Sequence, residues 1–230
     1  MPPEVHALLF DTYGTVVDWR GGVLEALASL GINVAWDAVL ADSEPRPILD
    51  RVNSGAAPWM TMESVHRQAL GAALARHQVT GLSEEEIDAL VQARWRLAPW
   101  PDSVPGLTRL KRRYVIGPLS NASFAGMVRL AKFAGLPWDC VITAENARRY
   151  KPHADVYRTA LGLLGLEASE VMLAAAHNYD LAAAQALGWR TAFVPRPHEY
   201  GPGQTSDLVA EGKWDVVVDS VEELAAALRC

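Results

Sequence analysis

The stretch Phe10-Asp11-Thr12-Tyr13-Gly14-Thr15 decides the fold of this chain. The apolar run before it, residues 5–10, predicts a short buried β-strand. Asp11 stands directly after that strand, where open α/β sheets place their ligand crevice. The glycine and threonine that follow predict a turn of the backbone. We therefore expect Asp11 to lie in a crevice at the carboxyl edge of a sheet.

Apolar runs alternate with helical patterns from about residue 101 to the end of the chain. Such alternation predicts a parallel sheet covered by helices, which here means a three-layer, Rossmann-like α/β core. Glycines follow several of the helical patterns, as they do at helix C-termini. The predicted strands are 5–10, 114–119, 140–143, 171–176, 191–195 and 214–218, and the predicted helices are 124–134, 154–164, 181–187 and 221–228.

The region 18–98 has a different pattern, because helical segments follow one another with no strand candidate between them. They are predicted over 23–30, 35–52, 62–77 and 83–97. Ser83 followed by Glu86 has the spacing of a capping box at the start of the last one. We expect residues 1–17 and 99–230 to form the core, and residues 18–98 to form a helical cap inserted after the first strand, above Asp11.

Composition limits the classes of protein to consider. The 230 residues suffice for one large domain or for a core with an insertion. A net charge of −6 argues against nucleic-acid binding, which usually shows a clustered basic face. No run approaches the ~20 apolar residues of a membrane span. The two cysteines, Cys140 and Cys230, form no CxxC motif, so a disulfide framework or zinc site is not expected and a reducing cytoplasm fits.

Three further polar segments also follow predicted strands. Ser120 and Asn121 come directly after the strand over 114–119, where such side chains often cap the next helix. Arg149-Tyr150-Lys151-Pro152 places a lysine in a loop. A loop lysine is usually solvated, but beside a carboxylate it lowers the carboxylate pKa and keeps that group ionised. The last segment, 175–180, contains His177, Asn178 and Asp180.

The four segments, in this order and at this spacing, resemble the motifs of the haloacid dehalogenase (HAD) superfamily. Tyr13 stands where HAD phosphatases usually have a second aspartate, and this resembles the type II 2-haloacid dehalogenase branch. Phosphatases of the superfamily hold Mg²⁺, which prefers an oxygen shell with carboxylates. The fourth segment offers one acid, Asp180, where the phosphatase pattern offers two. The resemblance therefore implies an enzyme with no metal and no organic cofactor.

The resemblance also implies a role for each motif. Asp11 would be the nucleophile, Lys151 would keep it ionised, and Thr15 would position its carboxylate. Asp180, or His177, would activate the hydrolytic water, although a structural histidine at 177 is equally compatible with the sequence. The implied substrate-binding set comprises the backbone near Thr12 and Tyr13 together with Ser120, Asn121, His177, Asn178 and Tyr157.

One expected residue is missing from the cap. The dehalogenases that this chain resembles carry a halide-binding arginine about thirty residues after the nucleophile, and the segment 38–42 has none. Arg46 is the nearest arginine and Arg51 follows one to two turns later. We expect Arg46 to supply the cationic contact for the halide. The alternative is a solvated Arg46 between Pro45 and Pro47.

The implied function is hydrolytic dehalogenation of short 2-haloalkanoic acids to 2-hydroxy acids through an aspartyl ester. Two alternatives stay open. One is a Mg²⁺-dependent phosphatase of the same superfamily. The other is a HAD-fold protein without dehalogenase activity, which the missing arginine favours and the presence of Asp11 and Lys151 disfavours. The resemblance further suggests a homodimer, and no nucleic-acid or membrane partner is expected.

Overall fold

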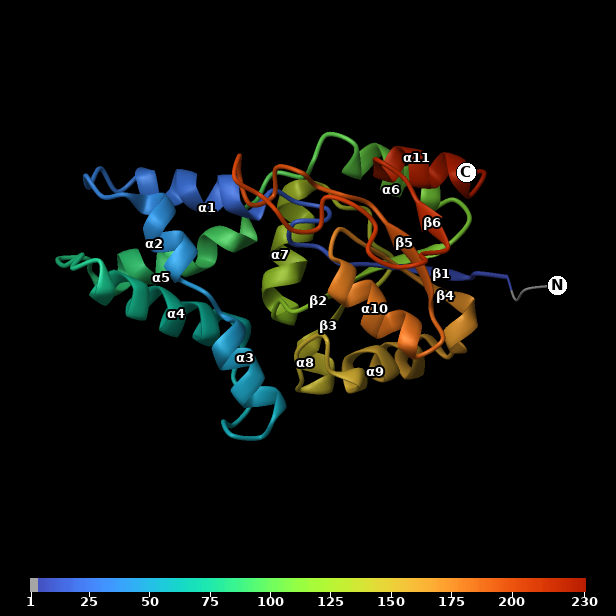
Figure 1. The fold of residues 1–230 in the computed structure, drawn as a ribbon, viewed down its shortest axis with the longest axis horizontal. Coiled ribbons are helices and arrows are strands. Elements are labelled where there is room, and N and C mark those ends of the chain that lie inside the picture. Colours follow the sequence, from blue (N-terminus) through green and yellow to red (C-terminus); the bar gives the residue numbers. More distant parts are fainter. Residues whose placement is uncertain (1–3) are drawn as a thin grey trace.

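The computed structural model describes residues 4–230. Its core is one six-stranded parallel sheet with the strand order β3-β2-β1-β4-β5-β6 (Figure 1). The predicted α/β class and parallel sheet are thus confirmed. The strands are β1 (Ala7–Phe10), β2 (Val115–Ser120), β3 (Ile142–Thr143), β4 (Val171–Ala175), β5 (Arg190–Phe193) and β6 (Val216–Val217).

Alternation along β1 produces the three layers. Leu8 and Phe10 belong to one buried apolar cluster, whereas Ala7 and Leu9 belong to a second. Successive side chains of a strand point to opposite faces, so one strand serves both clusters. The first cluster is closed by α6 (Ser103–Leu110), α7 (Phe124–Ala134) and α11 (Val221–Ala227), and the second by α9 (Ala154–Leu164) and α10 (Asn178–Ala186).

The register of the sheet gathers the polar segments at one edge. Phe10 pairs with Pro118 of β2 on one side and with Ala174 of β4 on the other. The three strands run parallel, so the residues that follow them emerge together. Asp11, the end of β2 and the segment after β4 therefore lie at the same carboxyl edge, as expected.

Two short helices of the core are absent from the sequence prediction. α6 contains a proline and a glycine, and α8 (Ala144–Ala147) spans a single turn. Neither gives a clear helical period. Gly106 of α6 also meets the backbone of Val221 so closely that a Cβ atom would collide with it. Gly106 weakens the helical signal in the sequence, and its lack of a side chain allows α6 to pack against α11.

Between β1 and α6 the regular elements are all helices, joined by turns and loops. We call these elements the cap helices: α1 (Trp19–Ala28), α2 (Trp36–Asp42), α3 (Arg46–Asn53), α4 (Met62–Arg76), α5 (Glu84–Gln92) and the 3-10 turn η1 (Ala93–Trp95). They lie beside the sheet, to the left in Figure 1. The two chain crossings between cap helices and core are adjacent, because Val17 bridges to Pro99. The capping box of Ser83 and Glu86 is present.

The single helix expected over 35–52 is wrong. The structure has α2 and α3 instead, separated by Ser43, Glu44 and Pro45. The helical region is disfavoured for a residue that precedes proline, so Glu44 before Pro45 favours the end of α2. The break turns the chain and brings Arg46 to the start of α3. No helix within residues 4–230 is long and apolar enough to cross a membrane.

Candidate active site

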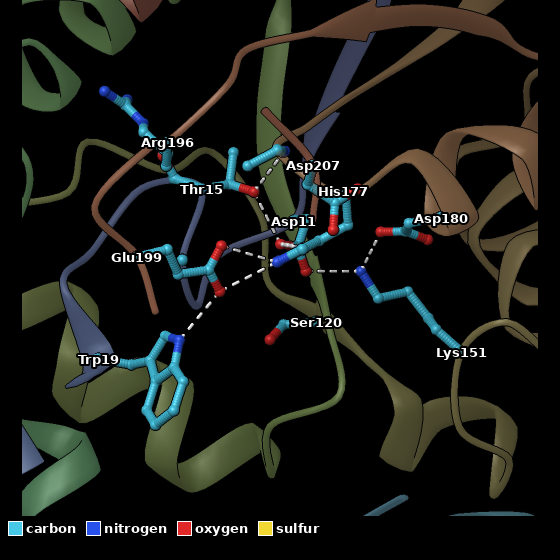
Figure 2. A network of polar contacts seen from close by, with 12 residues as sticks. Asp11, Thr15, Trp19, Ser120, Lys151, His177, Asp180, Arg196, Glu199 and Asp207 are labelled. Carbon is cyan, nitrogen blue, oxygen red and sulfur yellow. Dashed lines mark hydrogen bonds and ion pairs between the residues drawn. The ribbon is translucent and has the colours of Figure 1, made fainter. Parts of the chain in front are cut away.

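Asp11 is a buried carboxylate surrounded by donors. Its side chain is 6% exposed. Lys151 donates from Nζ to Oδ1 at 2.7 Å, and Thr15 donates from its hydroxyl to Oδ2 at 2.8 Å (Figure 2). His177 Nδ1 lies 3.0 Å from the same Oδ2. Burial raises the pKa of Asp11, but the charge of Lys151 and the contacts of His177 outweigh it and hold the pKa well below its ordinary value. Asp11 is therefore ionised at neutral pH.

Lys151 lies between two carboxylates. It is 2% exposed, and its Nζ also donates to Asp180 Oδ2 at 2.5 Å. Burial lowers the pKa of Lys151, but the charges of Asp11 and Asp180 outweigh it, so the pKa is raised and the amine stays charged. Tyr157 donates to the other oxygen of Asp180 at 2.5 Å. Asp180 thus positions Lys151, and Tyr157 positions Asp180. The side-chain oxygen of Asn121 accepts from the Lys151 backbone N–H at 2.8 Å and fixes the loop.

His177 connects Asp11 to a second buried acid, Glu199. The Nε2 atom of His177 lies 2.9 Å from Glu199 Oε2, and Glu199 is 2% exposed. Trp19 of α1 donates from its indole to Glu199 Oε1 at 2.9 Å. Burial lowers the pKa of His177, but its contacts with Asp11 and Glu199 raise the pKa well above its ordinary value. The free enzyme therefore carries an imidazolium between two carboxylates.

Glu199 is a site residue that sequence reasoning missed. It lies in the loop after β5, outside the four polar segments and separated from the last of them by strand β5. No spacing in the sequence pairs an acid of that loop with His177. Only the closure of the loop over the sheet edge brings the two together.

A cavity of about 450 Å³ opens above this network, between the core and the cap helices. Lys151 and His177 line it, so the Asp11 carboxylate that they both contact lies directly behind its wall. Tyr13, Asn121 and Arg46 also line it, as do Trp19, Leu40, Leu49, Met62, His66, Arg94, Tyr179, Glu199 and Tyr200. The cavity therefore has an ionised core side and a cap side on which apolar residues and arginines are mixed.

The remaining predicted residues around Asp11 are buried behind the cavity. Thr15 bridges two segments, since its hydroxyl also accepts from the Ala176 N–H at 2.8 Å. The Ser120 hydroxyl accepts from the Ala122 N–H at 3.3 Å and is 1% exposed. The hydroxyl of Thr12 is buried and has no partner within residues 4–230. The hydrogen bonds of Thr15 and Ser120 therefore fix the backbone at the edge of the sheet around Asp11.

Asn178 and Tyr157 do not reach the cavity. All four hydrogen bonds of the Asn178 amide are used: it donates to Asp207 and the Val209 carbonyl, and it accepts from the Glu211 N–H and the Trp214 indole. Asn178 therefore ties down the loop before β6. Tyr157 points to Asp180, as described above.

Two arginines of the cap helices line the cavity, the expected Arg46 and one that was not expected. Arg46 lines the cavity, with its guanidinium 4.9 Å from the centre of the Tyr179 ring. Arg51 is exposed and is not part of the wall. A third arginine, Arg94, lines the cavity and is buried, although sequence reasoning did not single it out.

The donor set at Asp11 does not suit a divalent metal. No group of three or more His, Cys, Asp or Glu side chains within residues 4–230 is arranged to hold a metal ion. Lys151 occupies the position between Asp11 and Asp180, and all four oxygens of these carboxylates accept hydrogen bonds. Mg²⁺ would need free carboxylate oxygens at this place.

Comparisons with known proteins agree with the geometry. A family profile described as haloacid dehalogenase-like hydrolase matches residues 5–188. The chain belongs to the haloacid dehalogenase-like hydrolases. The (S)-2-haloacid dehalogenase of Xanthobacter autotrophicus is 30% identical over 84% of this chain and 76% of its own. A crystal structure of a defluorinating L-2-haloacid dehalogenase is 42% identical, with a TM-score of 0.93 and full coverage of both chains. A probable phosphatase of Dickeya dadantii is 26% identical over 96% of this chain and 92% of its own.

In this haloacid dehalogenase-like hydrolase, the glycine of the first motif has a second role. Gly14 has a φ of +88°, a conformation that side chains rarely adopt. A Cβ atom at Gly14 would also collide with the Glu199 carboxylate. Glu199 can therefore reach His177 only because residue 14 has no side chain.

We expect Gly14→Ala to lower both stability and kcat. The backbone penalty alone is about 1–2 kcal/mol, and displacement of Glu199 would remove the partner of His177. Gly135→Ala is the matched control, because Gly135 has a φ of +65° and nothing within 4 Å of an added Cβ. Denaturant unfolding and steady-state kinetics should show a stability loss in both variants and a kcat loss only in Gly14→Ala. Equal kcat in the two variants would contradict the role of this close approach.

We expect Lys151→Met to slow the attack of Asp11 by about 10²-fold at neutral pH, because each unit by which the Asp11 pKa rises above ambient pH costs tenfold in ionised nucleophile. The exposed Lys213→Met is the charge-matched control. The measurement is single-turnover halide release as a function of pH. The rate of Lys151→Met should recover as pH rises, and a normal rate at pH 7 would show that Lys151 is only structural.

Proposed function

We propose that this protein hydrolyses short 2-haloalkanoic acids to 2-hydroxy acids through an aspartyl-ester intermediate. The observation that carries the proposal is the ionised Asp11, held by Lys151 on one oxygen and by His177 on the other. A carboxylate with a lowered pKa beside a cavity is suited to attack an electrophilic carbon. The names of the similar dehalogenases support this choice of substrate. The cytoplasmic location and the homodimer stay predictions.

In the first step, Asp11 attacks the halogen-bearing carbon. A carbon–oxygen bond forms, the carbon–halogen bond breaks, and its electron pair leaves on the halide. Lys151 keeps the attacking carboxylate ionised. Backbone N–H groups near Thr12 and Tyr13, with Asn121 on the cavity wall, hold the substrate carboxylate, and Ser120 fixes the start of the Asn121 segment from behind the wall.

In the second step, water hydrolyses the ester at the Asp11 carbonyl, and His177 is the base. Formation of the ester removes the negative charge of Asp11, so the pKa of His177 falls and its Nδ1 proton is released to solvent with the halide. The second proton of the imidazole stays on Nε2, in its hydrogen bond to Glu199. The lone pair of Nδ1 then faces Asp11. Nδ1 then takes one proton from the attacking water, and the water oxygen bonds to the Asp11 carbonyl carbon. When the bond between that carbon and the substrate oxygen breaks, the second proton of the water moves to the departing alkoxide oxygen, so the 2-hydroxy acid leaves and Asp11 is again a carboxylate.

His177 suits the role of base better than Asp180 does. His177 lines the cavity, whereas Asp180 is fully buried and both of its oxygens accept hydrogen bonds. Asp180 is therefore a positioning residue for Lys151.

The second candidate is a phosphatase, which the similarity to the Dickeya dadantii protein favours. A halide-release assay separates the two functions. Chloroacetate, bromoacetate, fluoroacetate and both enantiomers of 2-chloropropionate are tested with and without EDTA, beside p-nitrophenyl phosphate with and without Mg²⁺. We expect halide release that EDTA leaves unchanged. If the protein releases phosphate only with Mg²⁺ and releases no halide, the dehalogenase proposal is wrong and the phosphatase function is supported.

A further inference from the structure

Arg94 is a buried cation without an anionic partner. It belongs to η1, lines the cavity and is 9% exposed. Its guanidinium forms no hydrogen bond or ion pair with any residue of 4–230; only its backbone carbonyl is used, by the Tyr13 hydroxyl at 3.2 Å. Burial lowers the pKa of Arg94 to about 10, so the side chain still carries its charge at neutral pH.

No acid within residues 4–230 pairs with Arg94, and this includes Glu44, an exposed residue that also lines the cavity. His66 lines the same wall, and burial together with the charge of Arg94 lowers its pKa well below the ordinary value, so it is neutral. Glu63 is held elsewhere, since its carboxylate accepts from the Ser123 hydroxyl at 2.5 Å and the Trp95 indole at 3.2 Å. Glu199, which also lines the cavity, is engaged by His177.

The other cations of the cavity are already in contact with the protein. Lys151 and His177 each face two carboxylates. Arg46 is half-buried and lies over the Tyr179 ring. A charge removed from water without a partner is costly, and an anion in the cavity would offset that cost. Arg94 is therefore the cation of this cavity that is most in need of an anionic ligand.

We propose that Arg94 receives the halide as it leaves the substrate, an inference that rests on the proposed function. In a displacement at carbon, the leaving group departs on the side opposite the nucleophile. Asp11 rises from the sheet edge of the core, and Arg94 reaches the cavity from the cap helices. Negative charge thus develops on the halide on the side where Arg94 lies. Arg94 takes the place that the sequence assigned to Arg46.

Leaving-group dependence tests this role. Arg94→Met, Arg94→Lys and the control Arg46→Met are compared with wild type in single-turnover halide release from fluoroacetate, chloroacetate and bromoacetate. We expect Arg94→Met to lose about 10²-fold on chloroacetate, a magnitude typical of removing one stabiliser of transition-state charge. The loss should be larger for fluoride and smaller for bromide, and Arg94→Lys should recover part of it. An equal loss for all three substrates, seen as a higher half-saturating concentration with an unchanged maximal single-turnover rate, would show that Arg94 binds the substrate carboxylate instead.

Halide binding without turnover gives an independent readout. Thermal unfolding is followed in sodium bromide and in sodium gluconate at equal ionic strength. Bromide should raise the Tm of wild type and of Arg46→Met by mass action, and it should not raise that of Arg94→Met. In gluconate, Arg94→Met should be at least as stable as wild type, because it loses a buried charge without a partner. A bromide shift retained in Arg94→Met would overturn the inference.

The two readouts separate this inference from the proposed function. If wild type releases halide and Arg94→Met releases it at the same rate, the proposed dehalogenase function holds and the proposed role of Arg94 is refuted. If wild type releases no halide from any haloacetate but bromide still raises its Tm through Arg94, the proposed dehalogenase function is refuted and Arg94 remains an anion-binding residue.

Discussion

Asp11→Asn should abolish turnover while the protein stays folded. An amide is a poor nucleophile, and in the proposed mechanism the Asp11 carboxylate forms the bond to carbon. We expect kcat to fall on the order of 10⁵-fold or more, as for the loss of other covalent nucleophiles. Halide release measures the loss, and denaturant unfolding measures the fold. The exposed Asp219→Asn is the matched control and should retain wild-type activity.

An isotope experiment tests the same residue in the unaltered protein. Enzyme in excess reacts with chloroacetate in oxygen-18 water for a single turnover. Water attacks the carbonyl carbon of the ester, so the label should enter Asp11 and the product should carry an unlabelled oxygen from the original carboxylate. Label in the hydroxyl group of the product during that first turnover would show that water attacks the substrate directly, and the ester mechanism would be wrong.

The core of the fold was predictable because local signals and tertiary packing agree there. The strand before Asp11 is apolar throughout and fully buried, and Gly135 and Gly165 end their helices in the left-handed conformation that the sequence predicted. The helix over 35–52 failed because its apolar period continues across a proline break. The period reports which face is buried, whereas the dihedral restriction near Pro45 decides where the helix stops.

The candidate site was predictable where its residues belong to a recognisable motif or, as for Arg46, are the nearest residue of an expected type. Asp11, Lys151 and His177 each come from a segment with a recognisable position at the sheet edge, and the structure brings these three together. Glu199 and Arg94 come from a loop and from a 3-10 turn, whose conformations depend on contacts that are distant in sequence. Their roles depend on burial and on which charges remain unpaired. Neither property can be read from residue order.

His177→Gln should separate the two halves of the reaction. Glutamine can still donate a hydrogen bond near Asp11, so the first step should proceed. Glutamine cannot take a proton from water, and a general base typically contributes about 10²–10⁴-fold. We expect a burst of one halide per active site, followed by a steady state about 10³-fold slower than that of wild type. Mass spectrometry of the enzyme after chloroacetate should show one added carboxymethyl group on the peptide that contains Asp11.

The contrast with two other variants makes this burst diagnostic. His198→Gln makes the same substitution at an exposed position of the loop that carries Glu199, and it should react like wild type. Asp180→Asn should slow the burst itself, because Asp180 positions Lys151, which acts in the first step. If Asp180→Asn shows the burst and accumulates the ester, and His177→Gln does neither, the base of the second step is Asp180. The ionic contacts of His177 with Asp11 and Glu199 would then serve only to keep the nucleophile charged.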